Sequence, residues 1–212
     1  MYEQERKDLV EKLRQKGIKN ERVLDAILNV ERHLFVPDVM KPNAYKDVAL
    51  PIGYNQTISQ PYTVALMTEL LNPQVGDKIL EIGTGSGYQA AILYYLGAKV
   101  FTIERNINLY NRVLKLFDEL QLRIAVRCAD GTIGWEEFAP FDRIIVTAGG
   151  PEVPVRLKKQ LAINGTLVMP VGDRKSQVLK VMKKLSENEF HSSEIPYFAF
   201  VPLIGLEGWQ EK

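Results

Sequence analysis

The sequence predicts an α/β fold built on a doubly wound, mostly parallel sheet, with an N-terminal helical extension and antiparallel C-terminal strands. Between residues 77 and 171, short apolar runs alternate with segments of helical period, and a glycine-rich turn directly follows the first run. Strands of a parallel sheet are apolar along their length because helices cover both faces. The 212 residues are 46% hydrophobic and 25% charged, an ordinary globular composition, and we expect residues 1–212 to form one domain.

Residues 1–61 are expected to form helices followed by an ordered loop. An apolar stripe that includes Leu9 and Leu13 predicts a first helix, and Asn20 is placed to cap a second one. Prolines and glycines interrupt any helical period in residues 37–61, yet this stretch is too rich in aromatic and aliphatic residues for a disordered linker. We therefore expect a loop that crosses a binding site.

Residues 62–172 carry the alternation expected of a ligand-binding core. The predicted strands are residues 78–82, 99–103, 124–127, 143–146 and 166–171. Between the second and third of them, Leu109, Val113 and Phe117 are spaced to share one helix face. Strands that alternate with such helices predict a parallel sheet.

Residues 173–212 are expected to add antiparallel strands that line a substrate cleft. Apolar runs at residues 178–182 and 198–203 are separated by the polar stretch 186–189, and no clear helical period follows Val171. Strands connected in this way would give the parallel sheet an antiparallel edge.

The candidate binding motif is Glu81-Ile82-Gly83-Thr84-Gly85-Ser86-Gly87, which follows the first predicted strand and opens the next helix. Doubly wound sheets bind nucleotide-like ligands at such strand ends. A dinucleotide fingerprint would place a third glycine at position 88, but Tyr88 stands there, and the Glu81 carboxylate would repel a phosphate. The motif therefore favours a cationic ligand without phosphate.

Two further acidic residues end the next two predicted strands. Glu104 ends the second, where a carboxylate can accept both hydroxyl protons of a ribose, and Asp130 with Gly131 ends the third. S-adenosylmethionine fits all three carboxylates. Its sulfonium and ammonium suit the negative field of Glu81, its ribose diol suits Glu104, and its adenine amine suits Asp130.

Residues 77–171 resemble class I S-adenosylmethionine-dependent methyltransferases, which have a Rossmann-like fold, and residues 31–61 with 140–209 are similar to their protein-L-isoaspartate O-methyltransferase branch. The segments that carry this similarity are residues 32–37, 44–47, 51–53, 56–61, 141–149 and 201–205. The Thr-Ile-Ser loop of this family is intact at 57–59. Glu31, Asn55 and Tyr62 depart from the residues that are frequent in the family, so Tyr62 leaves no role for a histidine at that position.

The resemblance implies methyl transfer from S-adenosylmethionine to the free α-carboxylate of L-isoaspartyl residues in damaged proteins and peptides, leading through a succinimide to normal aspartyl. Ser59 is the expected catalytic residue, and no metal is expected. Expected cofactor contacts are Thr57, Ile58, Glu81, Gly83, Thr84, Gly85, Gly87, Glu104, Asp130 and Gly131. Expected substrate contacts are Ser59, Val201, Pro202, Leu203, Ile204 and Gly205.

The sequence also favours a carboxylate acceptor indirectly. A carboxylate is ionised at neutral pH and needs no general base, whereas an amine or a cytosine does. The sequence has no Asn-Pro-Pro-Tyr motif, and Cys128 is expected at the end of a buried strand, unlike an exposed nucleophile. Catalysis would then consist of alignment and exclusion of water.

The charge and the cysteine content limit which partners and which cellular compartment we expect. The formal net charge of +1 disfavours a nucleic-acid partner, and the charged start and the lack of a long apolar run predict no secretory signal and no membrane span. A single cysteine and two histidines leave little for a disulfide or a metal site. We expect a cytoplasmic monomer.

Two alternatives stay open. One is a methyltransferase of the same fold with an RNA or small-molecule acceptor, which the near-neutral charge and the intact 56–61 loop argue against. The other is a non-catalytic adaptor that binds isoaspartyl peptides, which the intact Ser59, Gly83 and Glu104 argue against.

Overall fold

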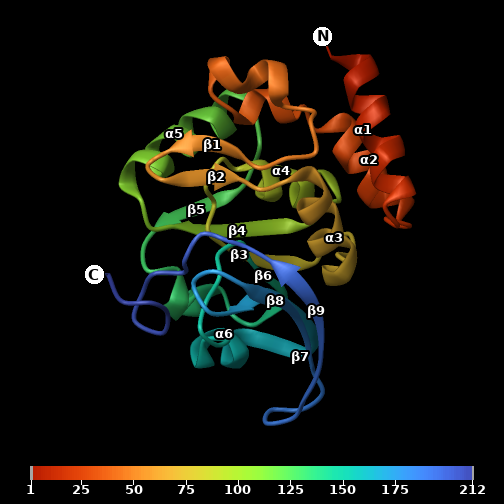
Figure 1. The fold of residues 1–212 in the computed structure, drawn as a ribbon. Helices are drawn as coiled ribbons and strands as arrows, with labels where there is room; N and C mark the ends of the chain where they lie inside the picture. The colour runs from red at the N-terminus through yellow and green to blue at the C-terminus, as the bar shows by residue number, and fades with distance from the viewer. Residues whose placement is uncertain (1, 212) are drawn as a thin grey trace.

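The computed structural model describes residues 2–211 and has a central sheet with the strand order β5-β4-β3-β6-β7-β8-β9 (Figure 1). These strands are β3 Lys78–Ile82, β4 Lys99–Glu104, β5 Ala125–Cys128, β6 Phe141–Val146, β7 Leu161–Gly172, β8 Gln177–Lys184 and β9 Phe190–Phe198. Neighbours from β5 to β7 are parallel, whereas β8 is antiparallel to both β7 and β9. The predicted doubly wound sheet with an antiparallel C-terminal edge is confirmed.

Helices and one small hairpin surround this sheet. The α-helices are α1 Glu3–Gln15, α2 Glu21–Asn29, α3 Pro61–Leu71, α4 Tyr88–Tyr95, α5 Ile107–Glu119 and α6 Val155–Gln160. Short 3-10 helices are η1 Arg32–Phe35, η2 Asp38–Asn43, η3 Gly131–Ile133 and η4 Glu136–Phe138. The strands β1 Leu50–Gly53 and β2 Gln56–Ile58 pair as an antiparallel hairpin within the predicted loop.

Side chains alternate between the two faces of the sheet, and this alternation divides the core in two. Ile79 and Ile145 belong to the core under α1 to α5, whereas Leu80 and Ile144 belong to the core that includes Leu157 of α6. Figure 1 shows α6 on the opposite side of the sheet from α1 and α2. Glu81 follows Ile79 by two residues, so its side chain faces α3 and α4.

Local signals fix the helix starts. The Asn20 side chain accepts hydrogen bonds from the backbone N–H groups of Arg22 and Val23, which confirms the predicted cap of α2. Asn106 caps α5 in the same way. Helix α3 begins at Pro61, whose ring fixes the backbone angle φ that a first helical residue needs.

The last strand lies elsewhere than predicted. We expected a strand at residues 198–203, but β9 covers Phe190–Phe198. Strand β9 forms the edge of the sheet and most of its side chains are exposed, so its sequence mixes polar and apolar residues and contains no continuous apolar run over its length. The apolar run after it forms isolated bridges and not a strand: Val201 O accepts from Gly149 N, and Leu203 N donates to Gly149 O, both at 2.8 Å.

Cys128 corrects a second expectation. Strand β5 is the other edge of the sheet, and the Cys128 side chain at its end is exposed, where we expected a buried position. Within residues 2–211, none of the helices is both long enough and apolar enough to cross a membrane.

Candidate functional site

The candidate site lies where the strand order of the sheet reverses, at the carboxyl ends of the parallel strands β3, β4 and β6. Strand β3 pairs with β4 on one side and β6 on the other, which places Ile82 opposite both Ile103 and Val146. The residues that follow these three strands therefore meet at one edge. A crevice at such a switch point is the usual ligand site of open α/β sheets.

The glycine turn after β3 approaches the end of β6 closely. Gly83 has φ +94°, and a Cβ at that position would lie 2.6 Å from Thr147 Oγ1. The Thr147 hydroxyl lies 2.7 Å from Gly83 O, its acceptor. Gly87, with φ +86°, precedes α4, and a Cβ at this position would clash with the Phe117 ring. The role of this glycine is therefore close packing. It does not border the three cavities described next. Only glycine combines these angles with such close approaches.

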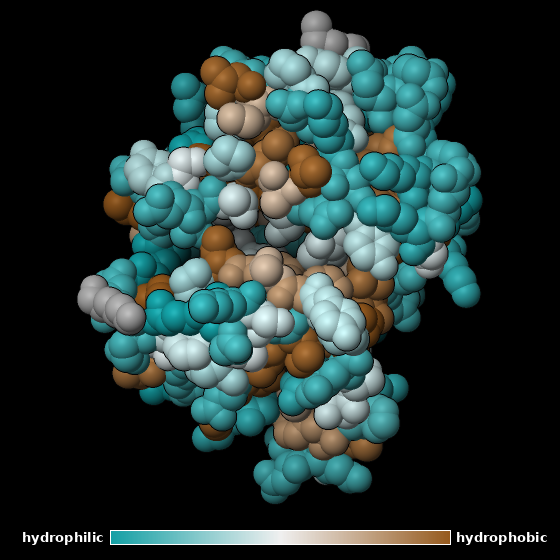
Figure 2. Space-filling view, in the orientation of Figure 1, coloured by the Kyte–Doolittle hydropathy of each residue, from teal (hydrophilic) through white to brown (hydrophobic). Residues whose placement is uncertain are grey.

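Three cavities that share bordering residues lie near this turn. The strand-end cavity, about 320 Å³, is bordered by Gly83, Gly85, Glu104, Asn106 and Gly131. The inner chamber, about 30 Å³, lies between the glycine turn, α3 and α4. The outer cavity, about 470 Å³, lies between the start of α3 and residues 195–201. Figure 2 shows a hollow in the middle of one face of the molecule, bordered by apolar residues.

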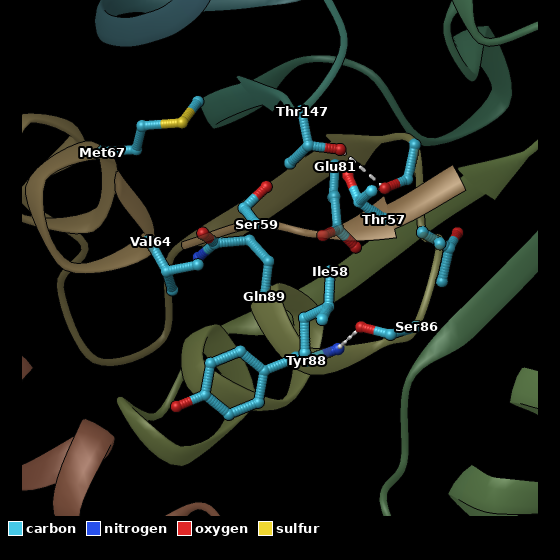
Figure 3. Close-up of a pocket in the computed structure, with 13 residues that line it drawn as sticks. Thr57, Ile58, Ser59, Val64, Met67, Glu81, Ser86, Tyr88, Gln89 and Thr147 are labelled. Atoms are coloured by element: carbon cyan, nitrogen blue, oxygen red, sulfur yellow. Dashed lines mark hydrogen bonds between the residues drawn. The ribbon is translucent and has the colours of Figure 1, made fainter. Parts of the chain in front are cut away.

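Thr57 and Ser59 separate these cavities. Thr57 borders all three, and Ser59 borders both the inner chamber and the outer cavity. In Figure 3 the side chains of Ser59, Glu81 and Thr147 surround the same space, and the Tyr88 hydroxyl points away from it. The β1–β2 hairpin holds Thr57, which pairs with Pro51, while Ile58 is buried and anchors the hairpin. A group passed from one cavity to the next would cross beside Ser59.

Glu81 is a fully buried carboxylic acid at the inner chamber. Its Oε2 accepts a hydrogen bond from the Thr102 hydroxyl at 2.6 Å, and its Oε1 has no hydrogen-bond partner among the described residues. Burial raises the pKa of Glu81 to about 8; the Thr102 hydrogen bond lowers it, and the charge of Glu104 raises it further. An unpaired buried carboxylate oxygen suits a ligand that carries positive charge.

Glu104 holds the glycine turn against the end of β4. Its Oε2 accepts from Gly85 N and its Oε1 accepts from Asn106 N, both at 2.8 Å. The side chain nevertheless borders the strand-end cavity. Each carboxylate oxygen can accept more than one hydrogen bond, so Glu104 can also accept from hydroxyl groups in the cavity.

Asp130 and Gly131 differ in their position. Gly131 borders the strand-end cavity and has no room for a Cβ, which would clash with Ile82. Asp130 does not border that cavity: it caps η3 by accepting from Thr132 N at 2.8 Å, and its other oxygen accepts from Leu206 N at 2.7 Å. Its predicted contact with an adenine amine stays a prediction, because in the structure this carboxylate holds the C-terminal segment.

The predicted substrate segment 201–205 is divided between cavities. Val201 borders the outer cavity, whereas Pro202, Leu203 and Ile204 border the strand-end cavity. Gly205 borders neither and packs against Asp130.

Several bordering residues were not predicted. Gln89 of α4 and Met67 of α3 reach the inner chamber, and Tyr197 and Phe200 reach the outer cavity. Thr147 carried a usable signal, because it directly follows a predicted strand as Glu104 does. The others come from helix faces and the C-terminal segment, and no local pattern distinguishes them.

The charges around the cavities indicate the kind of ligand. Among residues 2–211, no lysine, arginine or histidine borders the inner chamber, and Arg105, at the strand-end cavity, forms an ion pair with Glu211. A phosphate would find no free cation here among residues 2–211, whereas a ligand with positive charge would find Glu81. The described part of the chain also holds no group of three His, Cys, Asp or Glu side chains that could bind a metal ion.

Comparisons with known proteins indicate the family of this chain. Residues 4–208 match the family model described as protein-L-isoaspartate(D-aspartate) O-methyltransferase. A protein-L-isoaspartate O-methyltransferase of Chlorobium limicola is 55% identical over 207 residues, which are 96% of this chain and 94% of that protein. One of Cytophaga hutchinsonii is 47% identical over 98% of this chain and 94% of its own.

A solved structure extends the comparison to three dimensions. It is a protein-L-isoaspartate O-methyltransferase of Plasmodium falciparum in complex with S-adenosyl-L-homocysteine. The two chains are 26% identical with a TM-score of 0.82, over 93% of this chain and 97% of the other. The chain described here therefore belongs to the protein-L-isoaspartate(D-aspartate) O-methyltransferase family.

Proposed function

We propose that this protein is a protein-L-isoaspartate(D-aspartate) O-methyltransferase, EC 2.1.1.77, which methylates the free α-carboxylate of L-isoaspartyl residues in damaged proteins and peptides. The observation that carries the proposal is the position of Ser59 between the inner chamber and the outer cavity. A donor on one side and an acceptor on the other would meet at this residue.

The strand-end cavity and the inner chamber hold the cofactor, S-adenosylmethionine, in this proposal. The residues present fit it: Glu81 offers an unpaired buried oxygen to a cation, Glu104 faces the cavity that would take the ribose, and Gly83 and Gly85 leave the backbone uncovered. The remaining proposed contacts that border these cavities are Thr57, Ile58, Thr84 and Gly131. Gly87 and Asp130 are proposed contacts that adjoin the bordering residues Ser86 and Gly131 in the chain. The bound cofactor supplies a methyl group on a positively charged sulfur.

The outer cavity holds the isoaspartyl acceptor. Ser59 orients the acceptor carboxylate, and Val201 with the chain that follows it to Gly205 forms the proposed substrate segment. The acceptor is already ionised at neutral pH, so no residue has to remove a proton from it. The protein contributes alignment of the two reactants and a site from which water is excluded.

The product is a methyl ester, and its chemistry makes the enzyme a repair enzyme. Methylation replaces an ionised carboxylate oxygen, a poor leaving group, by an ester oxygen that can leave as methoxide and takes up the proton of the attacking nitrogen to give methanol. The backbone nitrogen of the next residue can then close a five-membered succinimide ring without further enzyme, because the reaction is intramolecular. Hydrolysis of the succinimide gives normal aspartyl in part.

The three segments of the chain divide this work within one domain. Residues 1–61 supply the N-terminal helices and the Thr57–Ser59 loop, residues 62–172 supply the cofactor core, and residues 173–212 border the substrate cleft. We place the protein in the cytoplasm as a monomer that binds no nucleic acid, in keeping with its formal net charge of +1.

The test is methyl transfer from labelled S-adenosylmethionine to a peptide with one isoaspartyl residue, with the normal aspartyl peptide as the control. We expect label in the isoaspartyl peptide only, followed by succinimide and aspartyl peptide on chromatography. Label in RNA or a small molecule in place of the peptide would favour the alternative acceptors. Peptide binding without transfer would favour an adaptor, and a methyl ester that persists for hours would refute repair.

A further inference from the structure

Asp47 is a buried carboxylate outside the three cavities, and it contacts Gln60 and Tyr62, which follow Ser59 closely in the chain. Its side chain is 0% exposed. Oδ1 accepts from Tyr62 N at 2.9 Å, and Oδ2 lies 2.5 Å from Lys16 Nζ. Its backbone oxygen accepts from Gln60 Nε2 at 3.1 Å. Asp47 therefore holds two of the three residues that follow Ser59.

The residues that Asp47 holds form one wall of the outer cavity. Ser59, Gln60 and Tyr62 all border this cavity, and they lead into the first turn of α3. Tyr62 N is one of the N–H groups at the start of α3 that lack a partner within the helix, and Asp47 supplies its acceptor. The same carboxylate carries negative charge toward the positive end of the α3 dipole.

Lys16, just past the end of α1, completes the arrangement. Its ammonium pairs with Asp47 and lies 5.3 Å from the centre of the Tyr62 ring. Burial raises the pKa of Asp47, but the hydrogen bonds that its carboxylate accepts from Lys16 and Tyr62 N outweigh burial and hold the pKa below its ordinary value. The carboxylate is thus ionised, and each of its two oxygens has a partner.

The loop that carries Asp47 is held from its other side by Arg32. Arg32 is fully buried, and its Nε donates to Ala44 O at 2.9 Å. Its Nη2 lies 3.5 Å from Val48 O, next to Asp47 in the chain. Asp47 therefore has a fixed backbone from which to hold the start of α3.

We propose that Asp47 is a positioning residue for the acceptor, which sets the place of Ser59 and Tyr62 through the start of α3 and is itself fixed by Lys16 and the N-terminal helix α1. The inference rests on the proposed function, because it assigns the outer cavity to the acceptor. It gives the N-terminal extension a role in the reaction. A positioning residue acts on alignment, and a displacement of about 1 Å can cost roughly 100-fold in rate.

The test compares Asp47→Ala, Asp47→Asn and Lys16→Met. Asp47→Ala removes both side-chain contacts, so we expect kcat/KM for the isoaspartyl peptide to fall roughly 10- to 100-fold, with the Kd of S-adenosylmethionine changed less than about twofold. Asp47→Asn keeps an oxygen that accepts from Tyr62 N, so it should retain most of the activity. The kcat/KM of Lys16→Met should lie between the values of these two variants, because this substitution leaves the Asp47 carboxylate buried without its cation.

The matched control is Asp77→Ala. Asp77 also accepts a backbone hydrogen bond, from Gln74 N, and also pairs with a cation, Arg143, but it precedes β3 at the end of the strand away from the cavities. We expect this variant to lose stability while kcat/KM of the folded protein stays within about twofold of the wild-type value.

Hydrogen exchange of the peptide that covers residues 56–66 tests the placement independently of activity. We expect faster exchange there in Asp47→Ala and not in Asp77→Ala. Absence of transfer by the wild-type protein would refute the proposed function and leave this exchange test in force. The inference is overturned if folded Asp47→Ala keeps its kcat/KM, if its cofactor affinity falls in parallel, or if exchange at residues 56–66 does not change.

Discussion

Replacing Glu81 by glutamine should change how stability depends on pH. Because burial raises the pKa of Glu81 to about 8, above the ordinary 4.5, the folded protein without cofactor keeps a proton that the unfolded chain has released between these pH values. The free energy of unfolding therefore falls as pH rises through this window. Glu81→Gln keeps an acceptor for Thr102 but cannot titrate, so this part of the pH dependence is lost.

The size of the effect follows from the two pKa values. Each pH unit between about 4.5 and 8 is worth about 1.4 kcal/mol, so the full window amounts to roughly 5 kcal/mol as an upper bound. Other titrating groups are common to both proteins and cancel in the difference. The stability of Glu81→Gln relative to wild type should therefore rise by up to about 1.4 kcal/mol for each pH unit.

Urea denaturation of both proteins at pH 5.5, 6.5 and 7.5, without cofactor, measures this difference. A second series with saturating S-adenosylmethionine serves as the control, because positive charge beside Glu81 favours its ionised form and should flatten the wild-type slope. If the free energy of unfolding of wild type and of Glu81→Gln changes equally with pH without cofactor, Glu81 is not protonated in the cofactor-free folded protein, and the raised pKa assigned to it is refuted.

Three further substitutions test the remaining parts of the site. Glu104→Ala should weaken binding of S-adenosylmethionine by about 2 to 4 kcal/mol, because charge-assisted hydrogen bonds to the ribose are lost; unchanged affinity in calorimetry would exclude this ribose site. Ser59→Ala should slow single-turnover methyl transfer while cofactor affinity is retained, and a parallel loss of affinity would assign Ser59 to the cofactor. Gly83→Ala should lower both thermal stability and cofactor affinity, because its Cβ would lie 2.6 Å from Thr147 Oγ1 at φ +94°; a wild-type melting temperature would contradict this.

The sequence was sufficient wherever the signal is local. Apolar runs of strand length located β3, β4, β6 and β7, since a strand buried on both faces needs apolar residues along its length. Asn20 predicted the start of α2, because the side chain of a capping residue accepts hydrogen bonds from N–H groups only two and three residues further along the chain. The sequence also placed Glu81, Gly83 and Glu104 at one candidate site, because they lie at the ends of predicted strands and the ends of parallel strands meet at one edge of the sheet.

Sequence patterns failed to predict the structure where a residue's position depends on contacts with residues that are distant in the chain. Strand β9 was misplaced because an edge strand with exposed side chains has no apolar pattern, and Cys128 was thought buried because a sequence does not say which strand forms the edge. Asp130 follows the end of β5 by two residues, and one of its oxygens accepts a hydrogen bond from the backbone N–H of Leu206, 76 residues further along the chain.

The sequence by itself thus determined the doubly wound fold, the glycine turn and the acidic character of the ligand site, because these depend on short-range geometry and on charge. The tertiary structure decided which residues separate the cavities. Thr57 and Ser59 border a cavity together with the glycine turn, and Asp47, which contacts Lys16, accepts a hydrogen bond from Tyr62 N. Such contacts join residues that are distant in the chain, and no local pattern of residues encodes them.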